Sequence, residues 1–128
     1  MNSKEIQRLN MPWEKDYQYA QGIKSGNTVW LAGQLGHDGE GKLAEGMEAQ
    51  VRLSYTNIKN LLAAFNFVMD DVVEEVLYVL DMPAAFEATK KVRQQFYPHP
   101  DGVATTIVAV SGLALPGQLI EIKIVARQ

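Results

Sequence analysis

The sequence predicts an α+β domain in which a mixed sheet is covered on one face by two helices. Three observations predict this class: five runs with strand composition, two amphipathic stretches between them, and the resulting order ββαβαββ. A chain of 128 residues, 47% of them hydrophobic, is long enough to bury a real core. No linker or repeat divides it, so residues 1–128 are predicted to form a single domain.

The first two strands are predicted at residues 17–24 and 28–34, after an irregular lead-in over residues 1–16. The Ser-Gly-Asn tripeptide at residues 25–27 is typical of a hairpin turn, because glycine and asparagine tolerate positive φ. The second strand, TVWLAGQ, is rich in β-branched and aromatic residues. A Gly-rich loop over residues 36–41 follows it.

Two helices are predicted from the spacing of apolar residues. The first covers roughly Met47 to Phe65, and Asn66 is expected to end it in a left-handed cap. Its expected inner stripe is Val51, Tyr55, Ile58, Leu62 and Phe65. The second helix runs from Pro83, which suits a first helical turn, to about Tyr97. Its expected inner stripe is Ala85, Phe86, Thr89, Val92 and Phe96.

Three further strands are predicted at residues 72–80, 103–110 and 119–127. The two strand–helix–strand crossovers in this order require part of the sheet to be parallel. The first two of these strands are apolar on both faces, yet two helices can cover only one face of a sheet. Because an uncovered apolar face normally marks an association surface, we expect a homo-oligomer whose sheets face one another.

The last strand carries the main candidate for chemistry. Side chains alternate between the two faces of a strand, so Glu121 and Lys123 point away from the face that carries the isoleucines of residues 120–124. A carboxylate at Glu121 can orient or deprotonate a water. The alternative is a structural ion pair with Lys123 or with a cation of another subunit.

Composition excludes several classes of function. The net charge is −3 and no run of Lys or Arg occurs, so the basic footprint of nucleic-acid binders is missing. The absence of cysteine excludes disulfides and thiolate chemistry. His37 and His99 have no third ligand spaced to join them, so no metal site is predicted. With no secretory signal and no apolar run of about 20 residues, a soluble cytoplasmic protein is expected.

Several stretches resemble, in order, the motifs of one family. Residues 19–27 resemble its YSQAVxxGN motif, residues 29–34 VYxSGQ, residues 48–57 EAQTRQxxxN, residues 70–82 DDVVKxTVYLxDM, and residues 119–126 LVEIEAIA. Each motif is weak alone, but together they run from about Tyr19 to Ala126. On this basis the chain resembles the RidA (YjgF-type) reactive-intermediate deaminases, a family also called endoribonuclease L-PSP.

The resemblance implies a chorismate-mutase-like fold assembled as a homotrimer, with a cleft at each subunit interface. It also implies hydrolysis of imines or enamines to a keto acid and ammonia, without a cofactor. Carried over position by position, it gives catalytic roles to Glu121 and Tyr19, and substrate-binding roles to Gly33 and Thr106. Thr105, beside Thr106, and Lys90, where the family has an asparagine, are further substrate-binding candidates, with Lys90 as a possible replacement cation. The position of the family's substrate-clamping arginine is occupied by Ala104, so the substrate is expected to be atypical.

Each of these candidates also has a structural interpretation. Tyr19 would serve equally as an interface aromatic, Thr105 and Thr106 as strand formers, and Lys90 as a solvated helix lysine. Three functions stay open: a C–N hydrolase with an atypical substrate, a non-catalytic trimer that binds a small metabolite, and a ribonuclease. The acidic composition argues against the ribonuclease, because Lys and Arg contacts dominate binding to phosphate backbones.

Overall fold

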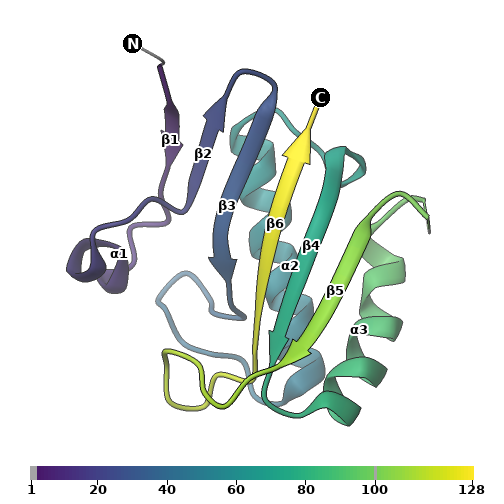
Figure 1. Ribbon diagram of the computed structural model, residues 1–128. Coiled ribbons are helices and arrows are strands. Elements are labelled where there is room, and N and C mark those ends of the chain that lie inside the picture. Colours follow the sequence, from purple (N-terminus) through teal and green to yellow (C-terminus); the bar gives the residue numbers. More distant parts are fainter. Residues whose placement is uncertain (1–2, 100) are drawn as a thin grey trace.

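Strand β6 (Ile120–Arg127) lies in the middle of a six-stranded mixed sheet (Figure 1). The computed structural model describes residues 3–99 and 101–128. The other strands are β1 (Glu5–Gln7), β2 (Gly22–Ser25), β3 (Thr28–Gln34), β4 (Val72–Val79) and β5 (Ala104–Ala109). Their order across the sheet is β1-β2-β3-β6-β4-β5, so β4 separates β5 from β6 although these two strands are consecutive in the sequence.

The pairing confirms the mixed sheet that the crossovers predict. Strand β6 is antiparallel to both of its neighbours, β3 and β4, whereas β4 and β5 are parallel. The β4–β5 connection contains helix α3 (Met82–Phe96), as expected for a strand–helix–strand unit. Pairing between β3 and β6 shifts register between Leu31 and Gln34, which marks a bulge in β3.

Two long helices, α2 (Met47–Ala64) and α3, lie behind the sheet in the view of Figure 1. A short helix, α1 (Pro12–Tyr17), lies at the β1–β2 end of the molecule, and a 3₁₀ turn, η1 (Met69–Asp71), precedes β4. Within the described residues no helix covers the front of the sheet. We call this front side the open face.

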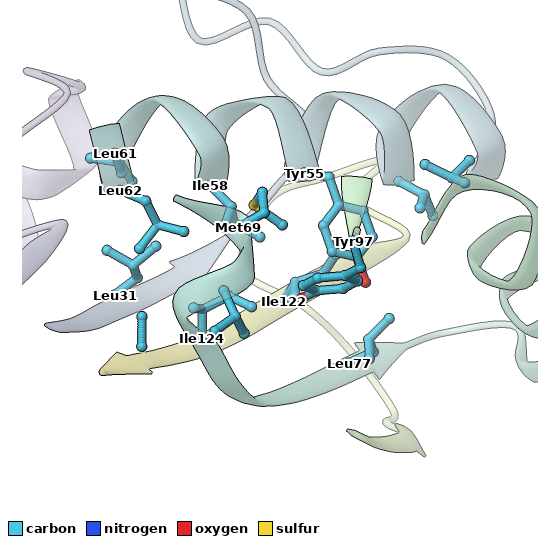
Figure 2. Close-up of a cluster of buried hydrophobic side chains, with 14 of the residues drawn as sticks. Leu31, Tyr55, Ile58, Leu61, Leu62, Met69, Leu77, Tyr97, Ile122 and Ile124 are labelled. Atoms are coloured by element: carbon cyan, nitrogen blue, oxygen red, sulfur yellow. The ribbon is translucent and has the colours of Figure 1, made fainter. Parts of the chain in front are cut away.

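The core lies between α2 and the covered face of the sheet. Figure 2 shows Ile58 and Leu62 of α2 above Leu31, Ile122 and Ile124 of β3 and β6. The inner stripe predicted for α2 is confirmed, since each of its five residues is at most 1% exposed. The predicted left-handed residue after this helix is also confirmed, because Asn66 has φ 62°.

Helix α3 confirms most of its predicted pattern. Its N-cap residue, Asp81, accepts a hydrogen bond from the Ala84 N–H at 3.1 Å, and Pro83 stands in the first turn as expected. The predicted stripe is wrong at Phe86, which is 55% exposed. Phe86 follows the buried Ala85 by one residue, and each residue turns the side-chain direction by about 100° around the helix, so Phe86 points away from the core. Ala88 is buried in its place.

The predicted irregular lead-in and the start of the first strand were wrong. Strand β1 and helix α1 form within residues 3–17, and β2 begins only at Gly22. A side-chain cap stabilises α1, because the Glu14 carboxylate accepts the N–H of Met11 at 2.7 Å. A helix of six residues is too short to show a hydrophobic period, so its spacing carries no signal.

Candidate active site

A hollow of about 370 Å³ opens on the open face, where β3, β4 and β6 meet the loop that follows β5. Its lining residues are Gly33, Tyr78, Val110, Gly112, Leu113, Glu121 and Lys123. Glu121 and Lys123 project from β6 on the same face, as the alternation predicts, and Tyr78 of β4 is paired with Glu121. The hollow therefore combines one carboxylate and one ammonium with a largely apolar wall.

Glu121 is held by a glutamine from the turn before β6. The Gln118 side-chain amide donates to Glu121 Oε1 at 3.3 Å and to the Ile120 carbonyl at 3.2 Å. Its own carbonyl oxygen accepts the N–H of Leu115 at 3.1 Å, and the side chain is buried. This anchoring fixes the turn and one carboxylate oxygen of Glu121 together.

Gly33 lies directly against the other carboxylate oxygen. A Cβ atom at this position would come within 2.2 Å of Glu121 Oε2 and 2.5 Å of its carboxyl carbon. Any side chain here would displace the Glu121 carboxylate from its present position. The structure thus brings Gly33 and Glu121 together, as expected, and gives a steric reason for glycine.

Tyr19 lies between α1 and β2, within electrostatic range of Glu121. Its hydroxyl accepts a hydrogen bond from the Gln21 amide at 3.4 Å. Burial, with smaller contributions from the charges of Glu14 and Glu121, raises the pKa of Tyr19 above its ordinary value. The phenol is therefore a proton-bearing donor at neutral pH. It does not itself line the hollow.

The two threonines of β5 point to opposite faces of the sheet. Thr106 lies on the open face beside Val76, which in turn pairs with Lys123 on β6. The Thr105 hydroxyl instead donates to Glu75 Oε2 at 2.8 Å on the helix side. The structure therefore separates Thr105 from Glu121, and it keeps Thr106 on the same face but outside the hollow lining.

Lys90 lies on α3, in the helical layer on the far side of the sheet from the hollow. Its side chain is 63% exposed and its ammonium lies 3.8 Å from Glu87 Oε1. Within one chain, Lys90 does not meet Glu121. The cation that does share the hollow with Glu121 is Lys123, which the sequence presented only as a possible ion-pair partner.

Lys123 makes a main-chain contact rather than an ion pair. Its ammonium donates to the carbonyl of Leu31, at the point where β3 bulges. Burial lowers the pKa of Lys123 from its ordinary value, although the charge of Glu74 opposes this shift. Among the described residues no carboxylate lies within 4.0 Å of this ammonium, so the Glu121–Lys123 pair considered from the sequence is not formed.

A second polar cluster lies on the helix side of the sheet. Glu75 of β4 is fully buried and accepts four hydrogen bonds. The donors, with their distances, are Tyr55 at 2.7 Å, Tyr97 at 2.8 Å, Arg93 at 2.6 Å and Thr105 at 2.8 Å. We call these five residues the Glu75 cluster. Burial raises the pKa values of both tyrosines, so both hydroxyls stay protonated as donors.

The register of β4 explains why the sequence did not reveal this cluster. Counting by two from Val72 would put Glu74 in the core, but a register shift between Val72 and Glu74 puts Glu75 there instead. The cluster joins α2, α3, β4 and β5, and each oxygen of the carboxylate has two donors. The Glu75 cluster therefore satisfies the buried carboxylate with hydrogen bonds from within the chain, and it leaves neither oxygen free to bind a substrate.

The described residues contain neither a cluster of possible metal ligands nor a helix that could span a membrane. Within residues 3–99 and 101–128, no three His, Asp or Glu side chains come together as metal ligands could. The described helices are all too short or too polar to cross a bilayer. His37 packs edge-on against Trp13, with ring centroids 5.2 Å apart, and lies away from the hollow lining.

Comparison with known proteins identifies the family. The family model described as "Endoribonuclease L-PSP" matches residues 13–128. The RutC family protein YjgH of Escherichia coli (strain K12) is 30% identical over 112 residues, which cover 88% of this chain and 84% of that protein. A protein of Dermatophagoides farinae named 2-iminobutanoate/2-iminopropanoate deaminase is 28% identical over 91 residues, or 70% of each chain.

The fold agrees with the same family. The crystal structure of Rv2704 from Mycobacterium tuberculosis, described as a member of the YjgF/YER057c/UK114 family, superposes with a TM-score of 0.87. The match covers 98% of this chain and 100% of that one, at 25% sequence identity. The resemblance found in the sequence motifs is therefore confirmed. The chain belongs to the endoribonuclease L-PSP family, whose members also carry the names RutC and YjgF.

Proposed function

We propose that this chain is a hydrolase that cleaves the C–N bond of a small imine or enamine in the hollow around Glu121. The observation that carries the proposal is the Glu121 carboxylate, held by Gln118 against Gly33 at the wall of an open hollow. Family membership supports the reaction class, since one relative is named 2-iminobutanoate/2-iminopropanoate deaminase. Ala104, where the family arginine is expected, supports a substrate that is neutral or held by a different cation.

The proposed reaction needs one base and no cofactor. An imine carbon is already electrophilic, so Glu121 has only to place a water and accept its proton as the C–O bond forms. This proton then passes to the nitrogen and gives a carbinolamine. The proton of the new hydroxyl group follows it to the nitrogen as the C–N bond breaks, so ammonia leaves and the carbon becomes a carbonyl. Tyr19, whose hydroxyl stays protonated, is expected to assist Glu121 by donating a hydrogen bond to the substrate.

The second candidate is a non-catalytic protein of the same fold that binds a small metabolite in the hollow. Ala104, in place of the family arginine, is the observation that favours it. The two are separated by generating 2-imino acids in situ with an amino-acid oxidase and following ammonia release. A hydrolase raises the rate in proportion to the amount of protein added. A rate equal to the protein-free rate, for 2-imino acids with neutral and with acidic side chains alike, contradicts the proposed hydrolase. A ligand that raises the melting temperature without turnover would then establish the binding protein.

The Gly33→Ala variant is expected to lose at least about tenfold in the hydrolysis rate while keeping its melting temperature within a few degrees. The new Cβ displaces the Glu121 carboxylate, which is the end of a flexible side chain and moves at little cost in stability. Ammonia release and thermal unfolding measure the two effects. Gly39→Ala is the matched control, because a Cβ there meets nothing within 4 Å. Equal activity of the two variants would contradict the placement of Glu121.

The open face supports assembly as a homotrimer with the hollow at the subunit interface. Trp30 is 43% exposed there, and Val76, Tyr78 and Val125 are only half-buried. Covering these side chains would remove apolar area from water, which drives association. The subunit number rests on the family resemblance.

Sedimentation equilibrium is expected to give three times the chain mass of 14.2 kDa for the wild type. The Trp30→Glu variant is expected to sediment as a smaller species, because it places a charge in the proposed interface. Phe86→Glu is the control, since Phe86 is also an exposed aromatic residue but lies on α3, away from the open face. Loss of assembly in both variants, or in neither, would contradict the open face as the interface.

A further inference from the structure

The ammonium of Lys123 shares the hollow with Glu121 and has donors to spare. A lysine ammonium has three N–H donors, and the Leu31 carbonyl takes one of them. Among the described residues, no carboxylate pairs with it. Tyr78, Val110 and Leu113 supply most of the remaining wall of the hollow, and none of them is charged. We propose that Lys123 binds the carboxylate of a small 2-imino acid and so determines the substrate class of the site.

The spacing of the two charged side chains fits such a substrate. The Cα atoms of residues two positions apart on a strand are separated by about 7 Å, and the side chains of Glu121 and Lys123 both enter the same hollow. In a 2-imino acid, the carboxylate is bonded directly to the C=N carbon. With the carboxylate bound to Lys123, the C=N carbon would face the same hollow as Glu121, whose carboxylate would position the attacking water.

The surroundings of Lys123 strengthen the ion pair that it would make. The side chain is half-buried, so its interaction with an anion is less screened than at the surface. Burial also lowers the pKa of Lys123, and a bound anion would oppose that shift. Glu74 lies further along the open face and does not come within 4.0 Å of the ammonium.

We call Lys123, the proposed carboxylate-binding residue, the anchor. It lies on β6, the central strand that also carries Glu121. The family arginine is expected on β5, where this chain has the exposed Ala104. Lys90 lies in the helical layer and cannot reach the hollow of its own chain. Lys123 is therefore the cation that replaces the arginine within one subunit. This inference rests on the proposed function for its reaction, but the anchor can be measured without turnover.

The experiment compares the binding of pyruvate with that of its neutral isostere, pyruvamide, by titration calorimetry. Wild type is expected to prefer pyruvate, and the Lys123→Met variant to bind pyruvate about 10- to 100-fold more weakly. Lys123→Arg should recover part of this loss, because it keeps the charge. Lys59→Met is the control and is expected to behave as wild type, since Lys59 is exposed on α2. In turnover, Lys123→Met should raise KM by a similar factor with little change in kcat.

The anchor and the proposed reaction fail in different ways. If wild type releases no ammonia but prefers pyruvate in a manner that depends on Lys123, the hydrolase is contradicted and the anchor stands. If wild type binds pyruvate no better than pyruvamide, or if Lys123→Met keeps the wild-type affinity, the anchor is overturned. That result holds even where Glu121-dependent hydrolysis is found.

Discussion

Replacing Glu121 by Gln is expected to lower the rate of imine hydrolysis by about 10²- to 10⁴-fold. Glutamine has the same shape and can still accept the hydrogen bond from Gln118, but it cannot take a proton from water. The change should therefore act on kcat more than on KM. Because the side chain lies at the rim of a hollow rather than in the core, the melting temperature should change little.

Ammonia release at several substrate concentrations measures this effect, with thermal unfolding recorded in parallel. Glu87→Gln removes an exposed carboxylate from α3 and serves as the matched control, with activity equal to wild type expected. The Lys123→Met variant gives a second comparison, since its loss should fall on KM. A Glu121→Gln variant with wild-type kcat would show that another group, or none, activates the water.

Replacing Arg93 by Met is expected to destabilise the fold by about 3 kcal/mol. The guanidinium lies 2.6 Å from the fully buried carboxylate of Glu75, and its removal leaves that charge in the core without a counter-charge. Three hydroxyl donors remain, which keeps the loss below that of a bare buried ion. Chemical denaturation at a fixed protein concentration gives the free energy of unfolding.

A double-mutant cycle tests the cause of this loss. Glu75→Gln combined with Arg93→Met removes both charges, so the double variant should be more stable than Arg93→Met alone. Arg52→Met is the control, because Arg52 pairs with Glu48 at the surface, 3.5 Å away, where such pairs contribute less than about 1 kcal/mol. Equal losses for Arg93→Met and Arg52→Met would contradict the role of the Glu75 cluster.

The parts of the fold that were predicted from the sequence are those with a clear period. Helix α2 buries a single stripe, so its spacing identified both the helix and its inner face. Strand β6 alternates between apolar and polar residues, and this placed Glu121 and Lys123 on one face. Helix α1 has only six residues and was missed for want of a period.

The errors at the site come from features that a period of two cannot show. Bulges in β3 and β4 change which residues face inward, and the bulge in β4 brought Glu75 into the core. The opposite orientations of Thr105 and Thr106 follow from their pairing with β4. Lys90 was named from an aligned position on a helix, and only the three-dimensional layer order shows that this helix lies behind the sheet.

The central place of β6 has a consequence for how the chain folds. Strands β3 and β4 are not neighbours in the sheet, because β6 lies between them. They are joined only when β6, which begins about 90 residues beyond β3 in the sequence, pairs with both. Loop closure over such a separation is slow, which makes β6 docking the expected late step of folding. Glu121 and Lys123 both lie on β6. In a chain that has not completed this step the proposed active site is not assembled, so we expect the hollow and the final closure of the sheet to form in the same event.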